Sequence, residues 1–168
     1  VSELHGAVTR NMFNNLWSDV PEDEVPITHI TNGIHTLTWL AEDLKEIYNK
    51  YLKLGWTEEI SRKDTWFNID NIPDDLLWNT HLKLKEQLIN FIRLKVRNQQ
   101  IMNGTSSGSI SESKYLLDPK ALTIGFARRF ATYKRANLIF RDIERIKKII
   151  NNPDMPVQII FAGKAHPA

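Results

Sequence analysis

Two short apolar runs near the end of the chain constrain its fold most strongly: ALTIGFA at residues 121–127 and VQIIFAG at 157–163. Each run is nearly continuous, which is typical of a strand that is covered on both faces of its sheet. Between them, residues 134–150 carry isoleucines at helical spacing on one face. A strand, a helix and a second strand in this order predict a βαβ unit over about residues 121–162, with parallel strands.

The residues before this unit are predicted to be mainly helical. Apolar residues recur at helical spacing over about residues 2–17 and 40–54, and a longer helix is expected from residue 74 or 75 to about residue 102. A short alternating run at 27–31 predicts a strand, and the Gly- and Ser-rich residues 103–113 predict a mobile loop or linker. The predicted fold class is therefore α/β, with a helical region followed by the βαβ unit.

Composition excludes several classes of protein. With 42% hydrophobic and 25% charged residues among 168, the chain can form a core. Its net charge of +2 is small for a nucleic-acid-binding protein, and no apolar run is long enough to span a membrane. It has no cysteine, which fits a reducing compartment, and the spacing of His29 and His35 predicts no metal site. Because the chain begins at Val1 and stops just after an apolar run, we expect a piece of a longer protein.

Positive charge is concentrated in residues 125–136, GFARRFATYKRA, where the first predicted strand ends. No acidic residue lies between Asp118 and Asp142. In open α/β sheets, ligands bind at the carboxyl ends of the strands, and a helix start there adds free N–H groups. The stretch therefore predicts an anion site, most naturally for phosphate, with Gly163-Lys164 at the same edge. Six cations lie between Asp118 and Asp142, four of them within residues 125–136: Lys120, Arg128, Arg129, Lys134, Arg135 and Arg141.

The residues alone leave an alternative open, namely that these are solvated cations at the start of a helix. Neither of the common Gly-rich nucleotide-binding motifs is present. No nucleophile, acid or base stands out, and a lone helical histidine such as His5 is more often structural than catalytic. From the residues, the chain is a phosphate-binding half of an α/β domain.

Four segments together resemble the α-glucan phosphorylases, the family that acts on glycogen, starch or maltodextrin. They are VSELHGAVTRNMF, ITNGIHTLTWL, TIGFARRFATYKRA and IIFAGKAHPA, and their order and intervals also match. The resemblance implies an internal fragment of a two-lobed, Rossmann-like glycosyltransferase (GT-B) fold. Residues 1–32 would end the N-terminal lobe, and residues 33–168 would open the C-terminal lobe that binds cofactor and phosphate.

The resemblance also implies the chemistry of the intact enzyme. Inorganic phosphate would cleave a terminal α-1,4-linked glucose from the glucan and give glucose 1-phosphate. The cofactor would be pyridoxal phosphate, bound to a lysine that lies beyond this chain. The phosphate group of the cofactor would transfer the protons of the reaction. We therefore expect a cytoplasmic enzyme, a homo-oligomer in some members, whose isolated 168-residue segment is inactive.

Site residues follow from the resemblance position by position. In the basic motif, Arg129 matches the cation that binds the substrate phosphate, and Lys134 matches the lysine that contacts the cofactor phosphate; both would be catalytic. Arg128 matches a cation near the cofactor phosphate, and Tyr133 matches a tyrosine beside the glucose. Two phosphate groups that lie close together require several cations without acidic neighbours.

The resemblance gives two further substrate-binding residues, His5 and Asn32, whose imidazole and amide would bond sugar hydroxyls from two sides. Ala131-Thr132 stand where familiar animal and plant enzymes carry His-Glu, so a bacterial or archaeal branch is favoured and regulatory sites do not carry over.

Two alternatives remain open. One is a GT-B glycosyltransferase that uses a sugar nucleotide and no pyridoxal phosphate, such as a glycogen synthase. The other is a stand-alone anion- or nucleic-acid-binding module, which would need aromatic residues among the cations, where Phe130 and Tyr133 are the candidates.

Overall fold

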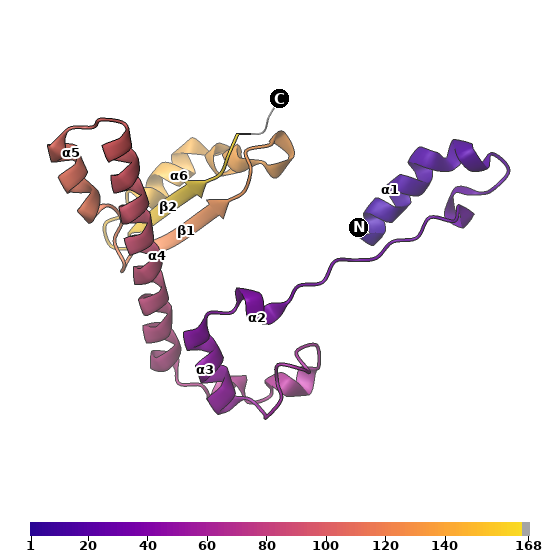
Figure 1. Ribbon diagram of the computed structural model, residues 1–168, viewed down its shortest axis with the longest axis horizontal. Helices are drawn as coiled ribbons and strands as arrows, with labels where there is room; N and C mark the ends of the chain where they lie inside the picture. Colours follow the sequence, from indigo (N-terminus) through magenta and orange to yellow (C-terminus); the bar gives the residue numbers. More distant parts are fainter. Residues whose placement is uncertain (166–168) are drawn as a thin grey trace. The chain divides into compact units, whose positions relative to one another are not determined.

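The computed structural model describes residues 1–165. By its internal contacts the chain divides into two compact units, Val1–Ile69 and a second unit that begins at Asp70 (Figure 1). Within residues 1–165, no helix combines the length and the apolar character that a bilayer-spanning segment requires. The predicted lobe boundary after residue 32 stays a prediction.

The first unit opens with helix α1, Glu3–Phe13, which continues into a 3-10 turn at Asn14–Trp17. The side chain of Ser2 caps the helix by accepting a hydrogen bond from the backbone N–H of His5 at 3.3 Å. The helix predicted for residues 2–17 is thus confirmed, with a tighter last turn.

Residues 27–31 run beside α1 in extended form but are not a strand, so that prediction is wrong. Their carbonyl groups bond to α1 instead of to another strand: the amino group of Val1 donates to Ile30 at 2.8 Å, and Arg10 donates to Ile27 at 3.2 Å. An added Cβ on Gly6 would lie 2.9 Å from the Cβ of His29, so only glycine permits this close approach. An alternating pattern cannot tell whether a partner strand is available.

The rest of the first unit is built on α2, Thr36–Trp39, and α3, Glu42–Tyr51. Gly55, at a φ of 78°, follows the predicted end of the second helix. A short 3-10 turn at Lys63–Trp66 belongs to the same unit, and another at Ile69–Asn71 spans the boundary between the units. The core of the first unit is aromatic: the ring of Tyr48 meets Trp56 and Trp66 edge-on at 5.5 and 5.9 Å, and Trp56 is only 2% exposed.

Four charged side chains form a network beside this core. Lys53 contacts Glu59 and lies 3.2 Å from Asp64, and Arg62 bonds to Asp64 at 2.9 Å and to Glu59 at 3.3 Å. The guanidinium of Arg62, followed by the ammonium of Lys53, holds the pKa of Asp64 at about 2, below its ordinary 3.8. Because the folded-state pKa is depressed, the unfolded chain takes up the proton first. The network's contribution to stability is then lost as pH falls from about 4 to about 2.

Replacing Asp64 by asparagine should therefore make the first unit less sensitive to acid. We expect the urea midpoint, followed by the fluorescence of Trp56 and Trp66, to fall less between about pH 5 and about pH 2 than in the unmodified chain. Asp19→Asn, at an exposed position of the same unit, is the control. An equal fall in the Asp64 variant and the unmodified chain would contradict the assignment.

The second unit begins with the long helix α4, Asp74–Met102, as predicted from residue 74 or 75 onward. Two aspartates occupy its first turn, where the helix dipole favours negative charge. It ends at Asn103, and Gly104 follows at a φ of 67°. Ile89 is fully buried and anchors the helix in the unit.

Residues 107–112 form a short helix, α5 (Ser107–Glu112), followed by a 3-10 turn at Ser113–Tyr115. The prediction of a loop or linker over residues 103–113 is therefore wrong for residues 107–113. Figure 1 shows α5 beside the end of α4. Ser113 is buried and donates a hydrogen bond to the carbonyl of Ile110 at 2.7 Å, so the Ser-rich composition is used for local bonding.

The predicted βαβ unit is confirmed. Strands β1, Leu122–Ala127, and β2, Val157–Ala162, pair in parallel, with Leu122 opposite Val157 and Ala127 opposite Ala162. Between them, helix α6 spans Ile143–Ile150 (Figure 1). The mixture of helices with a small parallel sheet agrees with the α/β class.

Two details of this unit differ from the sequence predictions. The helix expected from residue 134 begins only at Ile143, because Asp142 caps it by accepting from the N–H of Arg145 at 2.9 Å. The strands are not covered on both faces, since Leu122 is 61% and Ile124 41% exposed. Within the described residues, the sheet has two strands and lacks the further layers that a continuous apolar pattern predicts.

Candidate anion-binding site

The basic stretch lies at the carboxyl edge of the sheet, immediately after β1. There the backbone N–H of Phe130 donates to the carbonyl of Lys164 at 3.0 Å, and Phe130 pairs with Ala165 in an isolated parallel bridge. The structure thus brings the loops after both strands together, as predicted for Gly163-Lys164.

Gly163 is a residue of this edge whose role the sequence analysis did not find. A Cβ at this position would lie 2.2 Å from the carbonyl oxygen of Arg128, so the two loops meet only because residue 163 has no side chain. A glycine just after a buried strand was the available signal. The approach fixes the backbone from which Arg128 projects.

The backbone after β1 makes 3-10 turns at Thr132–Lys134 and Ala136–Phe140, joined by Arg135 at a left-handed φ of 52°. The predicted α-helix start is therefore absent from the basic stretch. The helix α6 begins only after these turns, and the side chain of Asp142 accepts from the N–H of Arg145 in its first turn. The positive potential of the stretch comes from side chains.

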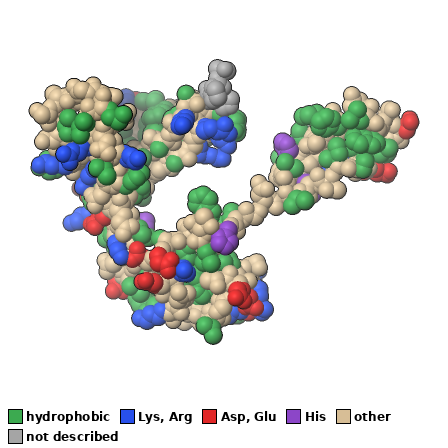
Figure 2. Space-filling view, in the orientation of Figure 1, with side chains coloured by type: hydrophobic (Ala, Val, Ile, Leu, Met, Phe, Trp, Pro, Cys, Tyr) green, Lys and Arg blue, Asp and Glu red, His purple; other side chains and the backbone are tan. Residues whose placement is uncertain are grey.

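These cations have no acidic partner within the described residues. Arg128, Arg129 and Arg135 are exposed, and Lys134 is half-buried with its Nζ 4.5 Å from the centre of the Tyr133 ring. Figure 2 shows Lys and Arg side chains gathered beside the end of the described chain. Exposed guanidinium and ammonium groups without carboxylates can bind an oxyanion by charge-assisted hydrogen bonds.

Four phenylalanine rings pack against one another beside the basic stretch. Phe126 stacks on Phe130 at 6.2 Å and lies 6.0 Å from Phe161, which in turn stacks on Phe140 at 6.0 Å. A hollow of about 420 Å³ lies beside this stack, and Lys134 and Arg135 are the cations among the described residues that line it. Arg128 and Arg129 do not line it.

The remaining predicted site residues lie in the first unit. His5 is exposed on α1, where its backbone carbonyl accepts from the hydroxyl of Thr9 at 2.7 Å. Asn32 is exposed just after the extended segment that bonds to α1, and its neighbour Gly33 has open space around it. The roles of His5, Asn32, Tyr133, Arg128, Arg129 and Lys134 stay predictions.

Curated proteins similar to this chain are phosphorylases. A maltodextrin phosphorylase of Thermococcus litoralis is 47% identical over 167 residues, which are 99% of this chain and 20% of that protein. The glycogen phosphorylases of Aquifex aeolicus and Mycobacterium tuberculosis are 43% and 35% identical over the whole chain, which covers 24% and 19% of them. No family model matches the chain, and no solved structure matches it significantly.

By this similarity the chain matches phosphorylases over its whole length. It corresponds to an internal fragment of an α-glucan phosphorylase, and the resemblance drawn from its four sequence segments is confirmed. It spans about a fifth of the length of these curated relatives.

Proposed function

We propose that the protein to which this segment belongs cleaves α-1,4-glucan with inorganic phosphate and releases glucose 1-phosphate. The observation that carries the proposal is the set of cations without acidic partners at the carboxyl edge of the parallel sheet. Similarity to maltodextrin and glycogen phosphorylases over the whole chain supports it.

Arg129 would bind the mobile substrate phosphate in this proposal. A guanidinium presents parallel N–H donors that match two phosphate oxygens, and Arg129 is exposed, so it can reach a ligand that enters and leaves. Charge that develops on the phosphate during cleavage of the glycosidic bond would be stabilised by these donors.

Lys134, with Arg128, would hold the phosphate group of pyridoxal phosphate. Lys134 is half-buried, and its ammonium stands over the Tyr133 ring beside a hollow, an arrangement that suits a fixed anion better than a mobile one. When bound, this cofactor supplies proton transfer through its phosphate group. The chain's own cations would keep two like-charged phosphates close together by lowering their repulsion.

His5, Asn32 and Tyr133 would contact the glucosyl unit. An imidazole, an amide and a phenol can each donate to or accept from sugar hydroxyls. The proposal assigns residues 1–32 to the N-terminal lobe and 33–168 to the C-terminal lobe of a GT-B fold. The exposed apolar positions of β1 support this, because a parallel sheet is normally covered by further layers. A cytoplasmic enzyme is part of the same proposal.

The experiment that tests the proposal compares the 168-residue chain with the complete polypeptide that carries it. Each is mixed with pyridoxal phosphate, inorganic phosphate and maltodextrin, and glucose 1-phosphate is measured. The complete polypeptide should form it only when phosphate is present, and the isolated chain should form none. Glucose 1-phosphate from the isolated chain, or none from the complete polypeptide, would contradict the proposal.

In the complete enzyme, His5→Ala and Asn32→Ala should each weaken transition-state stabilisation by roughly 1–3 kcal/mol, because a sugar hydroxyl loses its polar partner. Values of kcat/KM for maltodextrin measure this loss. Asn98→Ala, an exposed position on α4, should leave kcat/KM unchanged. If either site variant behaves like Asn98→Ala, that residue has no contact with the sugar.

A further inference from the structure

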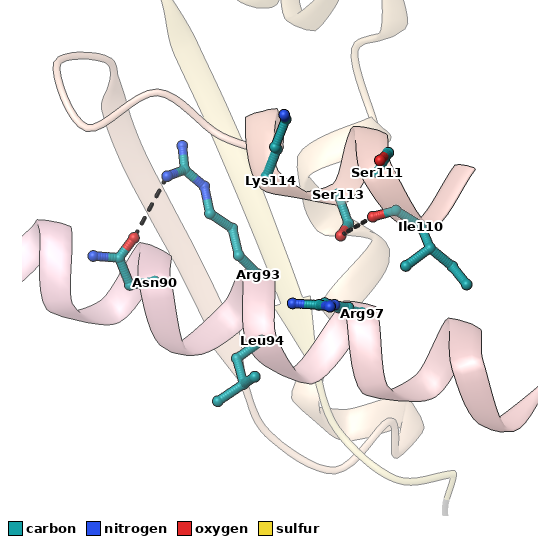
Figure 3. A pocket seen from close by; sticks show the side chains of 8 residues that line it. All are labelled: Asn90, Arg93, Leu94, Arg97, Ile110, Ser111, Ser113 and Lys114. Carbon is teal, nitrogen blue, oxygen red and sulfur yellow. Dashed lines mark hydrogen bonds between the residues drawn. The ribbon is translucent and has the colours of Figure 1, made fainter. Parts of the chain in front are cut away.

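A second gathering of cations lies away from the basic stretch, where α4 and α5 enclose a hollow of about 490 Å³ (Figure 3). Arg93 and Arg97 line it from α4, and Lys114 lines it from the 3-10 turn after α5. No acidic residue lines it among the described residues, and none of residues 125–136 does.

Arg93 is held in place by the backbone. Its Nε donates to the carbonyl of Leu116 at 2.8 Å and its Nη2 to that of Leu117 at 2.9 Å, while Nη1 reaches the Oδ1 of Asn90 at 3.4 Å. Leu117 has a φ of 67°, a strained conformation for a residue with a side chain. These hydrogen bonds hold Arg93 in the wall of the hollow and keep its positive charge in a fixed position.

The other donors of the hollow remain available. Arg97 and Lys114 are exposed and form no ion pair within residues 1–165, although the Nζ of Lys114 lies 4.8 Å from the Tyr115 ring. The hydroxyl of Ser111 also lines the hollow, whereas that of Ser113 already donates to Ile110. Figure 3 shows Arg97 on α4, with Lys114 and Ser111 on the neighbouring segment.

Several other cations of the described chain do have carboxylate partners. Lys53 and Arg62 share Glu59 and Asp64, and Lys147 bonds to Glu144 at 3.0 Å. Three cations that face one hollow without a carboxylate repel one another, and a bound anion would relieve that repulsion. Because like charges close together destabilise a fold, their presence here favours a role in binding an anion.

We infer that this hollow binds the phosphate group of a small molecule, with Arg97 and Lys114 as its charged ligands and Ser111 as a hydroxyl donor. Guanidinium, ammonium and hydroxyl donors together suit a tetrahedral oxyanion. Leu94 and Ile110 provide apolar walls that can accept the organic part of a phosphate ester. The cations recognise the phosphate group itself, which is shared by the free anion and a sugar phosphate.

The test uses hydrogen–deuterium exchange of the complete polypeptide, because exchange measured peptide by peptide locates a ligand. Inorganic phosphate and glucose 1-phosphate should each slow exchange saturably in peptides covering α5 and the end of α4. Glucose, and sodium chloride at matched ionic strength, should not. Protection by glucose 1-phosphate at lower concentration than by inorganic phosphate would identify the ester as the ligand, and equal protection would identify the free anion.

The variant Arg97→Gln/Lys114→Gln should raise the concentration for half-protection at least about tenfold, because two charge-assisted bonds are lost. Arg129→Ala should leave the protection unchanged, which separates this site from the proposed catalytic one. Ser111→Asp, which adds a carboxylate to the wall, is a second variant that should also abolish protection. The inference is overturned if α5 shows no saturable protection, if chloride protects equally, or if both variants are protected like the unmodified enzyme.

Discussion

Replacing Arg129 by alanine in the complete enzyme is expected to lower kcat/KM for inorganic phosphate and for glucose 1-phosphate by about ten- to a hundred-fold. The reason is the loss of charge-assisted hydrogen bonds to the mobile phosphate, at roughly 1.5–3 kcal/mol. Pyridoxal phosphate should stay bound, because Arg129 does not hold it in our proposal. Initial rates at varied phosphate, together with cofactor absorbance, measure both effects.

Two control variants sharpen this prediction. Arg129→Lys should restore activity only in part, because a point charge cannot reproduce the two parallel donors of a guanidinium. Arg141→Ala removes an exposed cation that lies beyond the two 3-10 turns, and it should leave the phosphate dependence unchanged. An unchanged phosphate dependence in Arg129→Ala would mean that the basic stretch is a set of solvated cations.

Replacing Lys134 by alanine should affect the cofactor instead. We expect weaker retention of pyridoxal phosphate and a lower kcat even at saturating inorganic phosphate, again by about ten- to a hundred-fold. The half-buried position of Lys134 beside Tyr133 underlies this expectation, because attraction between opposite charges is stronger at a partly buried site than in bulk water. Dialysis followed by cofactor absorbance and rate measurement tests it.

Arg135→Ala is the matched control for Lys134, because both side chains line the same hollow. The proposal assigns Arg135 no phosphate contact, so its loss should have the smaller effect on cofactor retention. Equal retention in Lys134→Ala and the unmodified enzyme would remove Lys134 from the cofactor site.

The parallel strands and the long helix α4 could be predicted because their signals are local and strong. A nearly continuous apolar run such as residues 122–127 has few alternatives to a strand, and α4 repeats its apolar positions over 29 residues. The order strand, helix, strand then fixes the parallel pairing without any long-range information.

The errors concern residues whose structure depends on partners distant in sequence. Residues 27–31 alternate like a strand, yet their carbonyls accept from Val1 and Arg10. Isoleucine spacing suggested a helix from residue 134, but the left-handed Arg135 and the cap at Asp142 delay it to Ile143. Periodicity reports which positions face a core and does not report where a helix starts.

The candidate site was predictable to a similar degree. The absence of acidic residues around Arg128 and Arg129 indicated an anion site, and the strand order placed it at the sheet edge beside Lys164. The close approach at Gly163 was not predicted, because a single glycine in a sequence does not indicate which residue lies against it. The division of Lys134 from Arg129 depends on the 3-10 turns, which no spacing rule predicts.

The most direct test of the central claim is the identity of the glucosyl donor. The complete enzyme is given a maltodextrin primer with either glucose 1-phosphate or a glucose nucleotide, and both chain extension and released inorganic phosphate are measured. A phosphorylase should extend the primer from glucose 1-phosphate, release one phosphate for each glucose added, and leave the nucleotide untouched. Extension from the glucose nucleotide alone would contradict the account and favour a glycogen synthase.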